Sequence, residues 1–173
     1  VMQKLFSQEI RFKDDDGNDY PNWQHLKIGS VAECLDNKRI PLNETERNDM
    51  VGDIPYYGAN GVVDYIDKYI FDEDLVLLAE DGGNFNDFAN KPIAQYLTGK
   101  TWVNNHAHIL TANLNIITNK FLFYSLIHKD IRKHIVGGGR AKLNRKDLLK
   151  ILINVPSLVE QIKIVEFFDG IFL

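Results

Sequence analysis

The chain has 173 residues, which suits one domain or one domain with an appendage. Apolar residues make up 45% and charged residues 25%, a globular balance that excludes a collagen-like or largely disordered chain. The formal net charge of −4, taken alone, counts against nucleic acid as a partner.

The N-terminal third predicts one helix end, one linker and one short helix. Residues 2–10 predict the end of a helix, and the acidic segment 13–22 predicts a linker because it cannot bury apolar surface. We expect the compact domain to open near Trp23. A short helix capped by Ser30 is expected over 30–35, followed by a long loop over 36–53.

The middle of the chain has a β pattern. Short runs rich in Val, Ile, Leu and Tyr predict strands over 54–57, 62–66, 75–79, 93–97, 102–104 and 108–111. The sequence GANG at 58–61 predicts a tight turn. The polar loop 81–87 contains Phe85, which we expect to be exposed, and loops held by strands often carry binding groups.

From residue 119 onward, the apolar residues recur at the spacing of a helix. One apolar stripe is formed by Phe123, Ile127, Ile131 and Ile135, and the glycines 137–139 are expected to end this helix. A short helix capped by Asn144 is expected over 144–149, and a strand over 151–155.

A capping box predicts the start of the last helix. Ser157 is expected to accept from the amide of Glu160, whose carboxylate would reach back. The helix carries an apolar stripe for which we predict a partner: Leu158, Ile162, Val165 and Phe168.

The charge is unevenly distributed. Between residues 128 and 150, here called the basic region, eight Lys and Arg face only two Asp. Such a local excess suits phosphate groups, although a solvated helical face explains the pattern equally well. The single cysteine, Cys34, excludes a disulfide framework and suits the reducing cytoplasm. No apolar run reaches the length of a membrane span, and we read a chain that starts on Val1 as part of something longer.

No sequence motif for catalysis is present: the chain has no Gly-rich phosphate loop, nucleophile elbow or zinc-protease helix. His106 and His108 would face one way in an extended segment, and Asp81 could add a carboxylate, so a metal-dependent nuclease is one alternative. Adjacent Glu80 and Asp81 would face opposite ways. Packing and hydrogen bonding are the commoner roles of such histidines.

Amide side chains are candidates for reading bases. Asn can pair with adenine in the major groove, and His can donate to guanine. Capping of local turns is the alternative explanation for each Asn. On these patterns we predict base-edge contacts from Asn60, Asn84, Asn86, Asn105 and His106. We predict phosphate contacts from Arg140, Lys142, Arg145 and Lys146, with Lys38, Arg39, Lys91 and Lys100 as secondary candidates.

Five segments together resemble a target recognition domain of the specificity subunit of type I restriction–modification systems. They are YYGANG at 56–61, LVLLAEDG at 75–82, WVNNHAH at 102–108, GGRAKLN at 138–144 and VPSLVEQIKI at 155–164. The resemblance implies an α/β (α+β) target-recognition-domain fold: a twisted, mostly antiparallel sheet with flanking helices, and partial spacer helices at both ends.

The resemblance also implies a domain organisation. Residues 1–12 would end a central spacer helix, 13–22 would be a linker, 23–156 the target recognition domain and 157–173 the start of a C-terminal spacer helix. The chain would then be the second, C-terminal recognition domain of such a subunit.

The function that the resemblance implies is non-catalytic recognition of double-stranded DNA. The domain would be half of a subunit that directs methyltransferase and restriction subunits to a bipartite site. S-adenosylmethionine, ATP and Mg would belong to those partners, with no cofactor and no metal in this chain. Two alternatives stay open: an assembly or self-association module acting through its terminal helices, and the nuclease at His106, His108 and Asp81.

Overall fold

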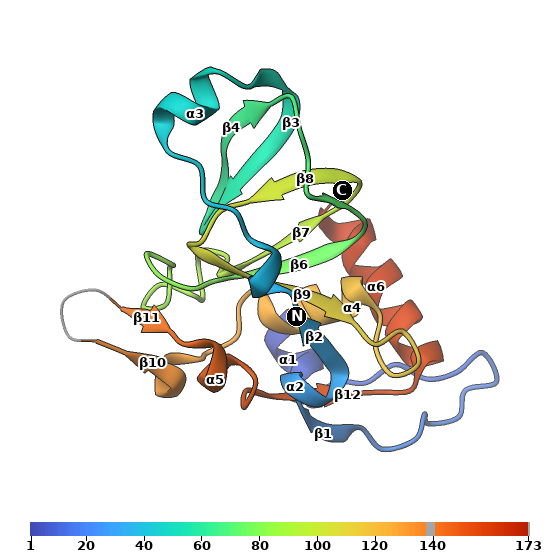
Figure 1. Ribbon diagram of the computed structural model, residues 1–173. Helices are drawn as coiled ribbons and strands as arrows, with labels where there is room; N and C mark the ends of the chain where they lie inside the picture. The colour runs from blue at the N-terminus through green and yellow to red at the C-terminus, as the bar shows by residue number, and fades with distance from the viewer. Residues whose placement is uncertain (138–140, 173) are drawn as a thin grey trace.

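The computed structural model describes residues 1–137 and 141–172 and contains two four-stranded sheets (Figure 1). The central sheet has the order β2-β9-β6-β7, is antiparallel, and consists of β2 (Ala32–Cys34), β6 (Leu75–Ala79), β7 (Ala94–Leu97) and β9 (Ala107–Ala112). The outer sheet has the order β4-β3-β8-β5 and consists of β3 (Val51–Gly58), β4 (Gly61–Ile66), β5 (Phe71–Asp72) and β8 (Lys100–Val103). Strands β3 and β8 run parallel, and the other two pairs of the outer sheet are antiparallel.

Two short antiparallel ladders and several helices complete the described chain. The ladders join β1 (Gln24–Lys27) to β12 (Leu152–Val155) and β10 (Ile135–Val136) to β11 (Lys142–Leu143). The α-helices are α1 (Met2–Phe6), α2 (Ile28–Val31), α3 (Glu44–Asn48), α4 (Asn119–Leu126), α5 (Arg145–Leu148) and α6 (Leu158–Phe172), and the 3₁₀ turns are η1 (Asp36–Lys38) and η2 (Arg132–His134). Among the helices described, none combines the length and the apolarity needed to cross a membrane.

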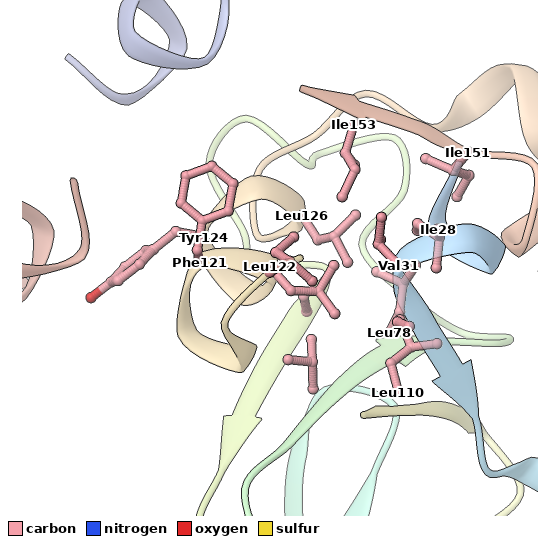
Figure 2. Packing of buried hydrophobic residues seen from close by; sticks show 14 of the residues in the cluster. Ile28, Val31, Leu78, Leu110, Phe121, Leu122, Tyr124, Leu126, Ile151 and Ile153 are labelled. Atoms are coloured by element: carbon pink, nitrogen blue, oxygen red, sulfur yellow. The ribbon is translucent and has the colours of Figure 1, made fainter. Parts of the chain in front are cut away.

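The core lies on both faces of the central sheet. Strand β6 is a continuous apolar run because both of its faces are covered. Val76 and Leu78 belong to the larger core cluster, which also contains Phe121 of α4 (Figure 2). Leu75 and Leu77 belong to a second cluster that includes Phe71 and Val103 of the outer sheet. The sheet therefore has no solvated face along β6.

The two ends of the described chain pack against each other. The rings of Phe6 in α1 and Phe168 in α6 stack at 6.0 Å, and β1 pairs with β12. Helix α1 ends at Phe6, earlier than the helix predicted for 2–10. The acidic segment 13–22 is tied to α6, because Lys163 Nζ donates to the carbonyl of Lys13 and to Asp15.

Only half of the predicted capping box forms. Ser157 Oγ accepts from the amide of Glu160 at 3.4 Å, as expected. The carboxylate of Glu160 is buried and is bound by Arg11 at 2.9 Å, so it does not reach back to residue 157. A buried carboxylate is stabilised more by a cation than by a reciprocal capping hydrogen bond, so Glu160 pairs with Arg11.

Two short-range predictions in the first third are wrong. Residues 30–35 are not a helix: α2 ends at Val31 and β2 follows, while Ser30 Oγ donates to the carbonyl of Lys27 instead of capping. The predicted long loop 36–53 contains η1, α3 and the start of β3. Helix α3 begins with a capping box between Asn43 and Glu46. This pattern is visible in the sequence, but the polar composition of the segment favoured the prediction of a loop.

Two further predictions fail beyond residue 80. Phe85 is 2% exposed and belongs to the core, because its loop folds back over the sheet. Helix α4 ends at Leu126, before Ile131 and Ile135, and Asp130 then accepts from the amide of Arg132 in a local turn that competes with helix. The glycines therefore do not end α4: Gly137 follows β10, and residues 138 and 139 lie outside the described chain.

The remaining elements agree with the sequence patterns. The six predicted strands of the middle region correspond to β3, β4, β6, β7, β8 and β9, and the predicted strand 151–155 corresponds to β12. Asn144 precedes α5 as expected, but its side chain makes no capping hydrogen bond.

Candidate functional site

A polar groove of about 420 Å³ opens between the β3–β4 turn and the loops that follow β6 and β8. Three of the five predicted base-edge residues line it, which are Asn60, Asn105 and His106. The rest of its lining is formed by Pro41, Leu42, Arg47, Tyr56, Gly58, Ala59, Val63, Asp81, Gly82 and Asn104. Segments far apart in the sequence therefore meet at one surface feature.

The first wall of the groove is the β3–β4 turn. Asn60 Nδ2 donates to the carbonyl of Gly82 at 2.8 Å, which joins the turn to the loop after β6. Gln95 Nε2 holds the same turn by donating to the carbonyls of Gly58 and Ala59. Gly58 is required here, because a Cβ would lie 2.7 Å from the side chain of Val63.

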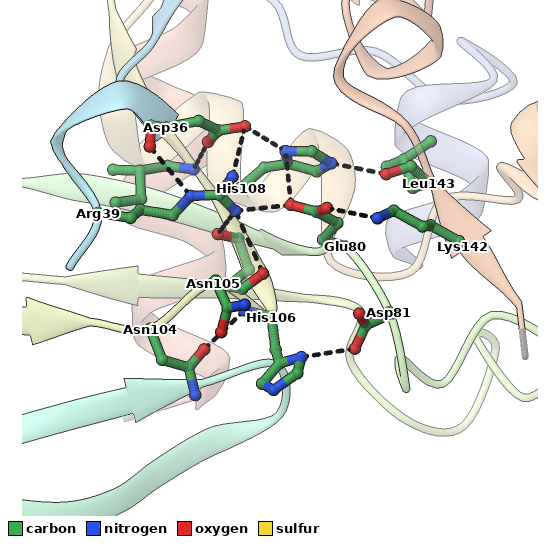
Figure 3. A network of polar contacts seen from close by, with 12 residues as sticks. Asp36, Arg39, Glu80, Asp81, Asn104, Asn105, His106, His108, Lys142 and Leu143 are labelled. Carbon is green, nitrogen blue, oxygen red and sulfur yellow. Dashed lines mark hydrogen bonds and ion pairs between the residues drawn. The ribbon is translucent and has the colours of Figure 1, made fainter. Parts of the chain in front are cut away.

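The second wall is the turn between β8 and β9. Asn104 is buried, and its Oδ1 accepts from the amide of His106 at 2.8 Å. The ring of His106 is fixed by Asp81, whose Oδ1 lies 2.7 Å from Nδ1 (Figure 3). Asn105 is exposed on the same turn. The turn thus presents Asn105 and an oriented imidazole.

Beside the groove lies an ion network of Asp36, Arg39, Glu80, His108 and Lys142, in which all side chains but that of Lys142 are mostly buried (Figure 3). Arg39 Nη1 donates to Glu80 at 2.6 Å and to the carbonyl of Ala107 at 2.9 Å. Lys142 Nζ lies 3.0 Å from the other carboxylate oxygen of Glu80. Two carboxylates are thereby shared among several cations.

His108 is held in the network by both of its ring nitrogens. Nδ1 lies 2.6 Å from Asp36 and Nε2 lies 2.7 Å from the carbonyl of Leu143, so both face acceptors. Burial opposes a charge on the ring, but the hydrogen bonds to Asp36 and Leu143 and the charge of Asp36 raise the pKa of His108 to about 9. His108 is therefore an imidazolium at neutral pH.

The two carboxylates of the network stay ionised. Burial works against this in both, but the hydrogen bond and charge of His108 lower the pKa of Asp36. Hydrogen bonds from Arg39 and Lys142 lower the pKa of Glu80 in the same way. The network is a set of full charges that compensate one another.

The network anchors part of the basic region beside the groove. The amide of Leu143 donates to the carbonyl of Glu80 at 2.7 Å, and Lys142 forms a β-bridge with Asp81. Leu143 itself is fully buried. Helix α5 follows immediately, so its exposed Arg145 and Lys146 continue from a fixed strand.

The predicted phosphate contacts occupy different settings. Arg140 lies outside the described residues. Arg39 is mostly buried in the network, Lys142 is paired with Glu80, and Lys91 is paired with Asp87. Lys100 lies over the ring of Tyr69, while Lys38, Arg145 and Lys146 are exposed.

Two predicted base-edge residues lie outside the groove lining. Asn84 donates to the carbonyl of Pro92 at 3.0 Å and lies 3.5 Å from Asn60. Asn86 is exposed on the same loop. Sequence patterns indicate no binding role for Arg47 or Tyr56, although both line the groove. Arg47 stacks on Tyr56 and binds Asp64 at 3.0 Å. Arg47 lies in the segment predicted as a loop, so no pattern indicated it.

The three residues of the predicted nuclease do not form one site. His106 and Asp81 face each other, whereas both nitrogens of His108 are occupied by Asp36 and Leu143. The one group of potential metal ligands in the described part of the chain is Cys34, Asp36 and His108. A ring that donates from both nitrogens has no lone pair for a metal, so the geometry does not favour this alternative.

The predicted partner residues of α6 do not share one exposed stripe. Phe168 is buried, and Val165 packs against the core. Ile162 is 52% exposed, and Leu158 is also exposed. The exposed apolar residues of the helix, in the part whose side chains are described, are Leu158, Val159, Ile162, Phe167 and Ile171.

The comparison with protein families identifies the class. Residues 20–172 match the type I restriction modification DNA specificity domain, so the chain belongs to this family. This match confirms the family resemblance seen in the sequence. It also confirms the prediction of a non-catalytic domain, because the matched family is a DNA specificity domain.

A curated relative agrees with this assignment. A putative type I restriction enzyme specificity subunit of Haemophilus influenzae is 35% identical over 144 residues, which are 83% of this chain and 36% of that protein. This chain therefore spans about a third of the length of that relative.

Solved structures share the fold. The S subunit of the type I restriction–modification system of M. genitalium matches with a TM-score of 0.73 at 14% identity, over 94% of this chain and 41% of that one. The HsdS subunit of Thermoanaerobacter tengcongensis matches with a TM-score of 0.57 at 17% identity, over 98% of this chain and 42% of that one. The predicted mixed fold with mostly antiparallel sheets is confirmed.

Proposed function

We propose that this domain recognises a DNA sequence, with base edges read in the polar groove and phosphates bound beside it. The observation that carries the proposal is the double role of residues 80–82. Glu80 holds Lys142 of the basic region, Asp81 holds His106, and the carbonyl of Gly82 accepts from Asn60. One short segment therefore fixes the polar groove and the basic region in a constant relation.

The groove supplies groups of the kind that read bases. Asn105 and His106 offer an amide and an imidazole on a turn that is held from both sides. Donors and acceptors that are fixed before binding discriminate between bases better than mobile ones, because no ordering is needed on contact. The exposed cations of α5 suit sequence-independent contacts with phosphates.

Family membership supports a wider function. We propose that the domain is the second, C-terminal recognition domain of a longer specificity subunit that directs methyltransferase and restriction subunits to a bipartite site in double-stranded DNA. S-adenosylmethionine, ATP and Mg would act in those partners. A cytoplasmic location accords with this role.

Selection of bound sequences from a pool of random duplexes tests the function. The wild-type chain should enrich one short motif, and the methyltransferase complex reassembled with the full subunit should enrich a split motif that contains it. Retention of the pool without enrichment would show sequence-independent binding and would contradict the proposal.

The exposed apolar face of α6 supports a second role in assembly. Leu158, Val159 and Ile162 are exposed on a helix whose opposite face is buried in the core. We propose that this face pairs with another helix, either of a partner subunit or of a second copy.

Sedimentation distinguishes the role in assembly from a surface with no partner. Ile162→Glu should lower the mass of any assembly that the wild-type chain forms, alone or with the methyltransferase subunit. Val51→Glu is the matched control, because Val51 is strongly exposed on the outer sheet. Unchanged assembly of the Ile162 variant would contradict this second role.

A further inference from the structure

His106 is oriented in the groove before any ligand binds. Its Nδ1 lies 2.7 Å from Asp81, and its backbone amide is held by Asn104 at 2.8 Å. The side chain is nevertheless 42% exposed and lines the groove. In Figure 3 the second ring nitrogen points away from Asp81. Among the described residues no partner binds Nε2, so the ring presents this nitrogen as its free edge.

The contact with Asp81 selects the tautomer of the ring. A carboxylate accepts hydrogen bonds, so the proton of a neutral imidazole resides on Nδ1. In that neutral form Nε2 carries a lone pair and acts as an acceptor. This assignment is an alternative to a contact in which His106 donates to guanine.

An acceptor at this position binds the amino group of a base edge and not a carbonyl oxygen. In the major groove, adenine presents an N6 amino group and cytosine an N4 amino group, whereas guanine and thymine present acceptor oxygens. We propose that His106 is a specificity-determining residue that accepts from the exocyclic amino group of adenine or cytosine, and that Asp81 is its positioning residue. This inference rests on the proposed function and names the base chemistry of the same site.

Sequence selection with variants of the full chain tests the assignment. His106→Ala should lose the preference at one base pair of the wild-type motif. Asp81→Asn should weaken the preference at the same position, because an amide can hold either tautomer. His106→Gln, which offers both a donor and an acceptor, should admit all four bases there. Asn48→Ala, which removes an exposed amide outside the groove lining, should select the wild-type motif.

A second measurement uses the adenine or cytosine of that base pair. Removing its exocyclic amino group should weaken binding by the wild-type chain roughly two- to tenfold, the range for one hydrogen bond. The same change should leave binding by His106→Ala unaffected. Thermal unfolding of both His106 variants at the wild-type temperature would establish that the fold is intact.

The outcomes separate the two proposals. If the wild-type chain enriches no motif, the proposed function and this inference both fail. If a motif is enriched but His106→Ala changes no base pair, or removal of the amino group leaves wild-type binding unchanged, DNA recognition stands and the assignment of His106 is overturned.

Discussion

At the scale of single residues, Glu80 and Asp81 connect two different environments. Their side chains diverge as the sequence pattern predicts: Glu80 binds Arg39 and Lys142 in the buried ion network, and Asp81 binds His106 in the groove. An extended backbone sends successive side chains to opposite faces, which produces this division. The pair therefore couples the stability of the network to the geometry of the groove.

Replacement of Glu80 should be strongly destabilising. The side chains of Glu80 and Arg39 are only 13% and 16% exposed, so Glu80→Gln removes one of the two carboxylates that compensate a largely desolvated guanidinium. Breaking a buried pair in this way lowers the free energy of unfolding by about 3–5 kcal/mol. Denaturant titration measures the loss.

Asp87→Asn is the control for Glu80→Gln. It breaks the pair with Lys91, whose side chain is 63% exposed, and should change the free energy of unfolding by less than about 1 kcal/mol. Equal effects of the two variants would contradict the distinction between buried and exposed pairs.

His108 should make stability depend on alkaline pH. Its pKa is about 9 in the folded chain, against about 6.5 for an unperturbed histidine, so the folded state binds this proton more tightly. The stabilisation is complete below pH ~6.5 and is lost as the pH rises to about 9, with a maximum loss of ~3 kcal/mol. Denaturant titration across this range should show the decline in the wild type but not in His108→Gln.

At the scale of elements, long-range burial explains where the sequence patterns succeed and fail. The strand runs are correct because each lies in a sheet whose core faces select Val, Ile and Leu. The stripe that continues past α4 to Ile135 misleads because Ile131 is buried by tertiary packing after the helix has ended. Short elements such as α2 and α3 show no apolar period, and α3 is marked instead by the capping box between Asn43 and Glu46.

The candidate site, too, could be predicted only in part. Asn105 and His106 stand out as polar residues between strands, and the structure puts them in the groove together with Asn60. The ion network could not be predicted, because it joins Asp36, Glu80 and Lys142 from distant parts of the chain. The role of Arg39 could not be predicted either, because its sequence context suggests a surface cation, whereas its side chain is mostly buried.

The start of α4 offers a test of a local signal. Thr118 Oγ1 accepts from the amide of Phe121 at 3.1 Å and so caps a helix that is packed on the central sheet. Thr118→Ala should lower the free energy of unfolding by about 0.5–2 kcal/mol, measured by denaturant titration. Thr98→Ala, at an exposed position between β7 and β8, should leave it nearly unchanged. Similar losses in both would argue against capping as the cause.

At the scale of the whole molecule, the net charge of −4 does not give the local charge of any one surface. Cations of the ion network are compensated by Asp36 and Glu80, whereas Arg145 and Lys146 are exposed on α5. The field near the groove is therefore set by fewer cations than the basic region contains. We expect weak binding of DNA by the chain alone and a marked dependence on salt.

The double variant Arg145→Ala and Lys146→Ala should reduce this dependence on salt. Each phosphate contact that is lost lowers the slope of log affinity against log salt by about 0.9, so the double variant should lower it by up to about 2, for every duplex sequence alike. Fluorescence anisotropy with a random-sequence duplex measures the slope. Lys4→Ala with Lys13→Ala removes the same charge from the N-terminal segment and should leave the slope unchanged.

The β1–β12 ladder has a consequence for biosynthesis. Gln24 pairs with Val155, so nearly the whole domain lies between the partners of this ladder. Contacts of such sequence separation form late, because the intervening chain must be ordered first. During translation β1 has no partner until β12 has left the ribosome. The apolar side chains that α6 covers stay accessible to chaperones until α6 has emerged as well.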